Sequence, residues 1–427
     1  MATPARRSDR RSRTAVVGSG IAGLTAAYLL TRTDDVTLFE SQDRLGGHTH
    51  THFVRGPGGQ SIPVDSGFIV HNDRTYPLLT RLFAELGVVT RDAEMSMSIS
   101  DPVSGLEYAG GKGVSGFVAH PTHLLRRDYR EVLLSVRRFH RLAAEFLAES
   151  AENDLSTFGD FIATQGFSPR FTELYAVPLV ACVWSAGRSD ALAYPARYLF
   201  RFLEHHGMLS IGNSPQWRTV VGGSTTYVDA IATRLADIRL DHPVTSITRG
   251  DDGVTIAHAR GADAFDRVVV ATHADQALTL LADATPLEKE VLGAFRYSHN
   301  ETVLHQDLTL LPRARRARAS WNYVVAPTGR SGPAVVTYWM NKLQGLDEGT
   351  ALLVTLNATD RVAADRILAT MDYTHPIYDP TSVAAQRRLP EINSATTAYA
   401  GAYHGWGFHE DGCRAGVAAA GSFGATW

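Results

Sequence analysis

Residues 14–23 read TAVVGSGIAG and residues 36–47 read VTLFESQDRLGG. The first stretch is a short apolar strand, Thr14 to Val17, followed by the pattern G-x-G-x-x-G and an apolar helix that extends to Thr31. The first glycine makes a tight turn, the second lets the backbone approach a pyrophosphate, and the third lets the helix pack on the strand. The helix N-terminus supplies amide donors and positive potential to phosphates. The pattern predicts a dinucleotide site in an α/β unit, against the alternative of a plain glycine turn in such a unit.

The second apolar strand ends at Glu40, about 20 residues after the first glycine. A carboxylate at this place accepts hydrogen bonds from both ribose hydroxyls of a dinucleotide. Its negative charge would repel a 2′-phosphate, so the sequence predicts that NADP does not bind at this site.

The segment from Glu40 to Gly47 resembles the E-x-x-x-R-x-G-G extension of the flavin amine oxidase and carotenoid desaturase superfamily. Other short segments of the chain resemble a bacterial subgroup of this superfamily, the predicted FAD-binding oxidoreductases. The resemblance implies that Arg44 and the paired glycines pack against the pyrophosphate and ribityl chain of FAD. It also implies that the turn Asp65-Ser66-Gly67 passes beside the flavin ring. Where the family usually has a second arginine, this chain has His48, and a neutral imidazole does not replace a guanidinium.

Later segments resemble the remaining parts of the same cofactor domain. Residues 265–272 form a predicted buried strand, and the resemblance places Ala271 near the cofactor and Val244 near the adenine. Residues 399–412 read YAGAYHGWGFHEDG and resemble the C-terminal FAD signature, in which a strand and a glycine turn lead into a helix facing the flavin pyrimidine. Many relatives carry an acid for the ribityl chain where this chain has Ala402.

The predicted fold class is therefore α/β, with an FAD-binding Rossmann-like domain of the glutathione-reductase type. The domain is assembled from three chain segments and accompanied by an inserted α+β substrate domain. Residues 12–67, 217–285 and 385–427 form the expected FAD-binding domain, and residues 68–216 and 286–384 form the expected substrate-binding domain. The predicted FAD-binding residues are Gly18, Ser19, Gly20, Ile21, Ala22, Gly23, Glu40, Ser41, Arg44, Leu45, Gly46, Gly47, His48, Ser66, Gly67, Val244, Ala271, Gly401, Gly407, Phe408 and His409.

The composition excludes several other classes of protein. The chain has 427 residues, 44% hydrophobic and 20% charged, which is typical of a globular protein of two or three domains. Its net charge of −3 gives no basic field for nucleic acid. Two cysteines fit a reduced cytosolic protein. His48, His50 and His52 alternate like ligands on one strand face, but no carboxylate or thiolate set accompanies them, so we predict no metal.

Arginines are concentrated in two regions. Residues 1–11 are predicted to be a flexible basic arm, with a twin-arginine signal as the alternative. No apolar run reaches the roughly 18 residues of a membrane span. The predicted location is cytoplasmic, with peripheral contact at the inner membrane surface as an alternative. The membrane alternative rests on arginines within and just before a predicted helix at residues 129–150, which would otherwise form an ordinary solvated face. These arginines are Arg126, Arg127, Arg130, Arg137, Arg138 and Arg141.

The catalytic residues are unknown from the sequence. Amine-oxidising relatives place a lysine near flavin N5 on a strand that corresponds to residues 298–304, and this chain has His299 and Asn300 there. His71, His299 and His305 are acid–base candidates, each with a structural role as the alternative. The covalent-flavin Cys-Tyr pattern is absent and Cys413 falls within the final helix, so we expect FAD to be bound non-covalently. Aromatic residues that suit either an apolar substrate or a sheet core are Trp321, Tyr323, Tyr338 and Trp339.

The sequence as a whole predicts an FAD-dependent oxidoreductase that transfers a hydride from a substrate C–H bond to flavin N5. The expected substrate is apolar, a lipid or an unsaturated fatty-acyl chain, and the expected electron acceptor is O2 or a quinone. An amine oxidase that uses O2 is the alternative. A non-catalytic FAD-binding redox partner of another enzyme is an alternative of a different class. The oligomeric state does not follow from the sequence.

Overall fold

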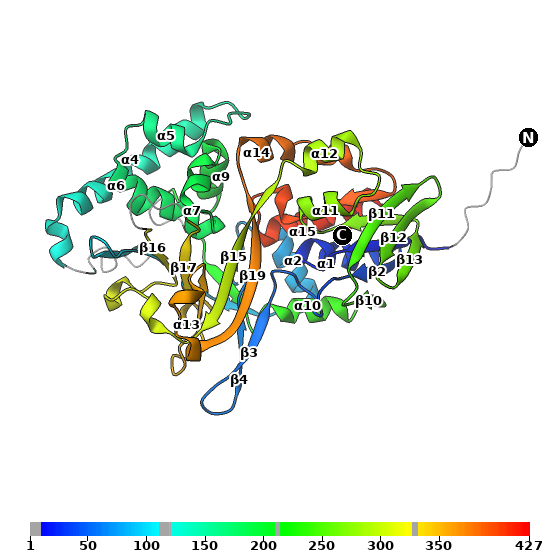
Figure 1. Cartoon of the computed structure of the whole chain (residues 1–427), viewed down its shortest axis with the longest axis horizontal. Helices are drawn as coiled ribbons and strands as arrows, with labels where there is room; N and C mark the ends of the chain where they lie inside the picture. The colour runs from blue at the N-terminus through cyan, green and yellow to red at the C-terminus, as the bar shows by residue number, and fades with distance from the viewer. Residues whose placement is uncertain (1–9, 111–118, 120, 210–213, 327–331) are drawn as a thin grey trace, which may run out of the picture. The chain divides into compact units, whose positions relative to one another are not determined.

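The computed structural model describes residues 10–110, 119, 121–209, 214–326 and 332–427. Contacts within the chain divide it into two compact units (Figure 1). Unit 1 consists of residues 1–47, 227–293 and 388–427, and unit 2 consists of residues 48–226 and 294–387.

The boundaries of these units differ from the expected domain ranges by short segments. The sequence assigns residues 48–67 to the FAD-binding domain, whereas they belong to unit 2. The physical reason is apolar packing, because Val54, Ile62 and Val64 join a buried cluster of unit 2. Three other short segments also change units. Residues 217–226 and 385–387 belong to unit 2, and residues 286–293 belong to unit 1.

Unit 1 is built on a five-stranded sheet in the order β10-β2-β1-β14-β20, and each neighbouring pair is parallel. Its middle strands are apolar and buried, as in a parallel sheet covered on both faces. This sheet, drawn from three chain segments, confirms the predicted α/β fold class. The strands are β1 (Arg13–Val17), β2 (Asp35–Phe39), β10 (Asp237–Arg239), β14 (Arg267–Val270) and β20 (Thr397–Tyr399).

Helices α1 (Ile21–Leu30) and α15 (His409–Ser422) come from opposite ends of the chain and pack against each other. A Cβ on Gly412 would lie 2.6 Å from Ile21 Cγ2, and one on Gly416 would lie 2.4 Å from a backbone oxygen of α1. Both positions therefore need glycine for the close approach of the two helices. The other elements of unit 1 are α10 (Thr225–Ala232, at the boundary), β11 (Val244–Gly250), β12 (Gly253–His258), β13 (Gly261–Phe265), α11 (Ala274–Leu280) and α12 (Pro286–Leu292).

Unit 2 contains a seven-stranded sheet in the order β19-β15-β18-β17-β16-β7-β8. The long strands β15 and β19 run antiparallel along each other (Figure 1). Strands β15 to β18 come from the second insertion, whereas β7 comes from the first insertion and pairs in parallel with β16. The strands are β7 (Met97–Asp101), β8 (Leu106–Gly110), β15 (Arg296–His305), β16 (Trp321–Val324), β17 (Val335–Trp339), β18 (Leu353–Leu356) and β19 (Ile367–Ile377).

The first insertion also forms the expected helices. The predicted helix at residues 129–150 is observed as α4 (Arg127–Glu149), which buries Val132, Phe139 and Ala143. Phe139 lies among other phenylalanine rings at centroid distances near 6 Å, which gives this part of unit 2 an aromatic core. The other helices are α2 (Pro77–Leu86), α5 (Phe158–Thr164), α6 (Pro169–Phe171), α7 (Val177–Trp184), α8 (Arg188–Ala193), α9 (Ala196–His205), α13 (Met340–Leu343) and α14 (Pro380–Gln386). The short strands outside the large sheet are β3 (Thr51–Arg55), β4 (Ser61–Asp65), β5 (His71–Asn72), β6 (Thr90–Asp92) and β9 (Trp217–Val220).

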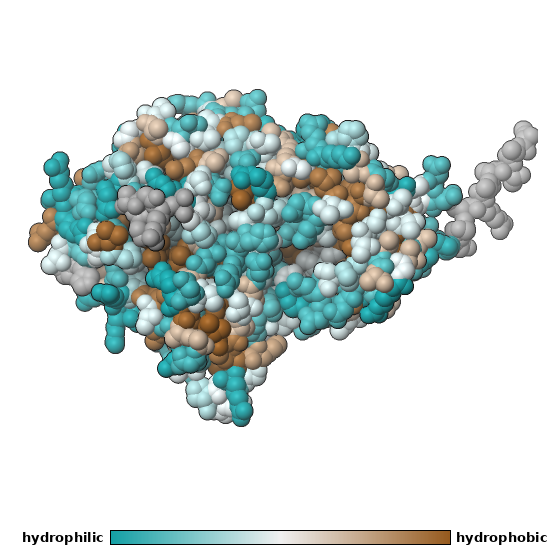
Figure 2. Space-filling view, viewed as in Figure 1, coloured by the Kyte–Doolittle hydropathy of each residue, from teal (hydrophilic) through white to brown (hydrophobic). Residues whose placement is uncertain are grey.

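The surface of the described chain is mostly polar. Figure 2 shows hydrophilic residues over much of one face, with apolar residues in separate patches. Among the described residues, no helix is long and apolar enough to cross a membrane. Two arginines of the basic region have acidic partners, since Arg126 binds Asp128 at 2.8 Å and Arg141 binds Glu145 at 2.8 Å. Residues 1–9 of the expected arm lie outside the described residues.

Candidate cofactor site

The carboxyl ends of the parallel strands bring the glycine motifs of unit 1 together. Gly18 follows β1 with a positive φ of +99°, and a Cβ there would lie 2.7 Å from Ala271 O, just after β14. A Cβ on Gly23 would lie 1.9 Å from Gly18 O. By contrast, a Cβ on Gly20 would meet nothing within 4 Å. Two of the glycines are therefore required by the packing of the protein itself, and Gly20 leaves open space at the N-terminus of α1.

Glu40 is a buried carboxylate that ties β2 to the glycine turn. Its Oε2 accepts from Ser19 N at 3.0 Å and Ser19 Oγ at 2.5 Å. Its Oε1 accepts from Gln42 N at 2.9 Å and Ser41 Oγ at 3.2 Å. Two of these four donors are hydroxyl groups, which rotate freely about their C–O bonds. Glu40 therefore has room to accept from ribose hydroxyls if Ser19 and Ser41 turn their hydroxyl groups away.

The RLGG turn folds back over the glycine motif. Gly46 N donates to Ser19 O at 3.1 Å, and a Cβ on Gly47 would lie 3.2 Å from Gly20 Cα. The Arg44 guanidinium donates to Gly47 O at 2.9 Å, so it holds this turn in place. Leu45 is half-buried between these residues. The turn therefore borders the open space above Gly20.

The C-terminal segment supplies the start of α15. Gly407 has a positive φ of +92°, and Phe408 lies just before the first helical residue, His409. The N–H of Phe408 donates to the carboxylate of Asp411 at 3.1 Å, and burial raises the pKa of Asp411 to about 6. His409 Nε2 lies 3.2 Å from the hydroxyl of Tyr227. The helix begins at His409, and its first turn contains Glu410 and Asp411, whose negative charge is favourable at a helix N-terminus. Gly401 precedes this segment at the end of β20.

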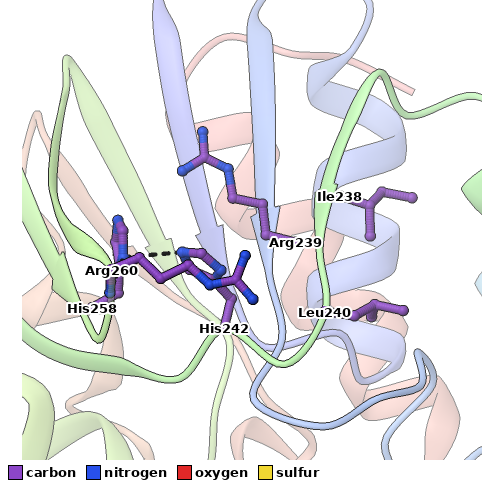
Figure 3. A pocket seen from close by; sticks show the side chains of 6 residues that line it. All are labelled: Ile238, Arg239, Leu240, His242, His258 and Arg260. Carbon is purple, nitrogen blue, oxygen red and sulfur yellow. Dashed lines mark hydrogen bonds between the residues drawn. The ribbon is translucent and has the colours of Figure 1, made fainter.

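A pocket of 480 Å³ flanks the segment that carries Glu40 (Figure 3). His242 N donates to Glu40 O at 2.9 Å, and Val244 begins β11 two residues later. His242 Nε2 lies 3.0 Å from His258 Nδ1, and burial followed by the nearby His258 lowers the pKa of His242. Arg239 is paired with two carboxylates, so its charge is neutralised. The lining residues are Ile238, Arg239, Leu240, His242, His258 and Arg260.

Three of the predicted cofactor residues, His48, Ser66 and Gly67, lie in unit 2. A Cβ on Gly67 would lie 2.0 Å from His48 O, so the turn after β4 packs directly on His48. Ser66 Oγ lies 2.7 Å from the hydroxyl of Tyr373 on β19. The His48 ring lies 5.1 Å from the ring of Tyr373 and 5.3 Å from the ring of His375.

Sequence reasoning missed Tyr373 and His375. Both lie on β19, and their alternation with Met371 is the pattern of a half-buried strand that could have identified it. His375 Nδ1 lies 3.0 Å from the amide nitrogen of Asn300, and burial lowers the pKa of His375 to about 3. His375 is therefore neutral over the physiological range.

The three acid–base candidates from the sequence lie elsewhere in unit 2. Burial lowers the pKa of His71 to about 4, and aromatic side chains such as Phe83 surround its ring. Burial also lowers the pKa of His305 to about 4, and its Nε2 lies 2.8 Å from Thr355 Oγ1. His299 has an exposed side chain. None of the three has a recorded contact with the cluster around Tyr373 in the described part of the chain.

Asp65 joins distant segments of unit 2 next to Ser66. It is fully buried and accepts from Ser224 N at 2.9 Å, Thr51 Oγ1 at 2.6 Å and Gln344 Nε2 at 2.8 Å. Burial raises the pKa of Asp65 to about 6. The carboxylate thus fixes the turn that carries Ser66 and Gly67.

The chain is similar in sequence to a known protein family and to several curated proteins. A family profile described as "Flavin containing amine oxidoreductase" matches residues 21–305. Amine oxidase [flavin-containing] A of Canis lupus familiaris is 28% identical over 254 residues, which covers 56% of this chain and 45% of that protein. Coproporphyrinogen III oxidase of Mycobacterium leprae (strain TN) is 28% identical over 289 residues, which covers 64% of this chain and 62% of that protein. The chain spans about half the length of the curated relatives it matches.

Solved structures share the fold over nearly the whole chain. Cyclohexylamine oxidase from Brevibacterium oxydans IH-35A matches with a TM-score of 0.69 and 19% identity, covering 97% of this chain and 98% of that chain. A CLA-producing fatty acid isomerase from P. acnes matches with a TM-score of 0.69 and 18% identity, covering 95% of this chain and 97% of that chain.

Proposed function

Because this chain belongs to the flavin-containing amine oxidoreductase family, we propose that it is an oxidoreductase that removes a hydride from a C–H bond of its substrate. Its cofactor is FAD, which accepts the hydride at N5 when bound. The observation that carries the proposal is the open space at Gly20, bordered by the RLGG turn and the start of α1. This space fits a pyrophosphate, because the helix N-terminus presents amide donors there.

The residues of unit 1 have separate roles in this proposal. The turn from Gly18 to Gly23 holds the pyrophosphate, Glu40 accepts from the ribose hydroxyls, and Val244 lies against the adenine. The amides at the start of α15 face the flavin pyrimidine and stabilise negative charge there. Both cysteines are buried within helices, which is consistent with FAD bound non-covalently.

We propose an apolar substrate, a lipid or an unsaturated fatty-acyl chain. Strand β15 has no lysine, and its buried polar residue Asn300 is bound to His375 instead. The rings of Trp321 and Tyr338 lie 5.5 Å apart in an edge-to-face arrangement that suits an apolar wall. The reaction would then need an electron acceptor, and we propose O2 or a quinone.

An amine substrate is the second candidate. It is favoured by the similarity to the canine amine oxidase, which extends over more than half of this chain. In that case O2 is the electron acceptor.

Anaerobic bleaching of the flavin distinguishes these candidates. We expect the flavin absorbance at about 450 nm to decrease with an unsaturated fatty-acyl substrate and to persist with benzylamine or a polyamine. The reverse result would replace the lipid by an amine. Flavin that neither class of compound reduces would show that the chain is a non-catalytic redox partner, and a protein that takes up no FAD would remove the whole proposal.

We also propose that the start of α4 contacts an anionic lipid surface. Leu125 is 80% exposed and Leu134 is 74% exposed, and the exposed residues Arg127 and Arg130 lie between them in the sequence. Basic residues beside exposed apolar ones are typical of interfacial helices. The protein should float with anionic vesicles at low salt and with neutral vesicles much less. Equal recovery with both kinds of vesicle would contradict the proposal.

A further inference from the structure

We infer that His52, Ser66, Tyr373 and His50 form a proton relay within unit 2. His52 Nε2 lies 3.0 Å from Ser66 Oγ, which lies 2.7 Å from the Tyr373 hydroxyl. That hydroxyl lies 3.0 Å from His50 Nδ1. Each of these groups can both donate and accept a hydrogen bond. When a hydroxyl group of this chain accepts a proton, it can therefore pass its own proton on to the histidine bonded to it.

The relay connects a buried centre with partly accessible ends. Ser66 is 5% exposed and Tyr373 is 7% exposed, whereas His50 and His52 are half-buried. The two imidazole rings lie 4.0 Å apart, at the start of β3. Water therefore reaches the two histidines more readily than the two hydroxyl groups.

Other titratable groups surround the relay. The His48 ring lies against the rings of Tyr373 and His375. His375 follows Tyr373 two residues later on β19. His375 stays neutral, since burial lowers its pKa to about 3. Asp65 precedes Ser66, with its oxygens bound to Thr51, Ser224 and Gln344. His50 and His52 are the imidazoles hydrogen-bonded to the two hydroxyl groups, so they are placed to receive a proton from them.

This inference rests on the proposed function and on the expectation from the family resemblance that the turn carrying Ser66 and Gly67 passes beside the flavin. A two-electron oxidation removes a hydride and a proton from the substrate; bound FAD would supply the hydride acceptor, so the proton is left for the protein to carry away. The proton comes from the N–H or C–H bond adjacent to the oxidised carbon. The Tyr373 oxygen binds this proton while its own proton passes to His50 Nδ1. His50 then releases a proton to water from its other ring nitrogen, so the charges and atoms balance.

Tyr373→Phe keeps the ring and removes the hydroxyl group. With the compound that bleaches the wild-type flavin, we expect anaerobic bleaching to slow by at least about 100-fold. The pH dependence of bleaching in the range where imidazoles titrate should also disappear. Tyr198→Phe is the matched control, because it removes the hydroxyl group of a tyrosine on α9 that accepts from Gln386 Nε2 at 3.2 Å. Equal rates and pH profiles in both variants would overturn the relay.

A second measurement does not need turnover. In protein labelled with ¹⁵N-histidine, the ring signals of His50 and His52 should titrate together, and Tyr373→Phe or Ser66→Ala should uncouple them. Signals that titrate independently in the wild type would overturn the relay, even if the flavin bleaches normally. Coupled signals in a protein that no substrate reduces would instead support the relay and contradict the proposed function. Ser66→Ala serves as the second variant if Tyr373→Phe does not fold.

Discussion

Replacing Gly20 with valine should give a folded protein that does not retain FAD. A Cβ at this position meets no protein atom within 4 Å, so the side chain has space in the apoprotein. We expect the unfolding free energy to change by about 1 kcal/mol or less, as for a substitution at a helix N-cap. The same side chain would occupy the space proposed for the pyrophosphate. The affinity for FAD should fall by at least about 100-fold, close to 3 kcal/mol.

Gly23→Val is the matched comparison, and it should fail for a different reason. Its Cβ would lie 1.9 Å from Gly18 O, so α1 cannot keep its distance from the turn. We expect a loss of about 4 kcal/mol or more in unfolding free energy. Thermal unfolding and FAD titration of both variants check the pair. A Gly20→Val protein that keeps its bound flavin would show that the cofactor does not approach this residue.

Asp65→Ala should produce the largest loss of stability in unit 2. The substitution leaves the donors of Ser224, Thr51 and Gln344 buried without their acceptor. A buried donor left without its acceptor typically costs about 1–3 kcal/mol. Chemical denaturation at neutral pH measures the effect. Asp73→Ala is the control, since this aspartate is exposed and its loss should change stability by about 0.5 kcal/mol or less.

The cost of Asp65→Ala should also depend on pH. Burial raises the pKa of Asp65 from 3.8 to about 6, so the folded state binds the proton more tightly than the unfolded state. The wild type therefore loses stability relative to the variant as the pH rises from about 4 to about 6, by roughly 1.4 kcal/mol per pH unit. The stability gap should be wider at pH 4 than at pH 7. A gap that widens with rising pH would contradict this account of the carboxyl group.

Much of unit 1 follows from local sequence. The turn at Gly18, the short strands and the spacing to Glu40 are set by interactions within a few tens of residues, and each part has its own steric reason. The sequence also predicts that residues near 401–409 return to this site. The start of α15 is less well predicted. Its first turn contains Glu410 and Asp411, and such polar residues after a glycine are equally typical of a loop.

Unit 2 depends on contacts between distant segments, which sequence patterns describe poorly. Nothing in the first insertion indicates that β7 pairs in parallel with β16, because such pairing requires a partner more than 200 residues away. The cluster around Tyr373 has the same origin, since β3, the turn after β4 and β19 meet only in the folded chain. The alternating pattern of β19 predicts a strand but not the neighbours of its side chains.

The pairing of α1 with α15 has a consequence for biosynthesis. During synthesis β1 and α1 leave the ribosome well before β20 and α15, which lie almost 400 residues further along the chain. Until then the nascent chain keeps apolar surface of α1 without its permanent neighbour, a state that invites chaperone binding. The proposed FAD site can therefore be completed only after the segment that carries α15 has been synthesised.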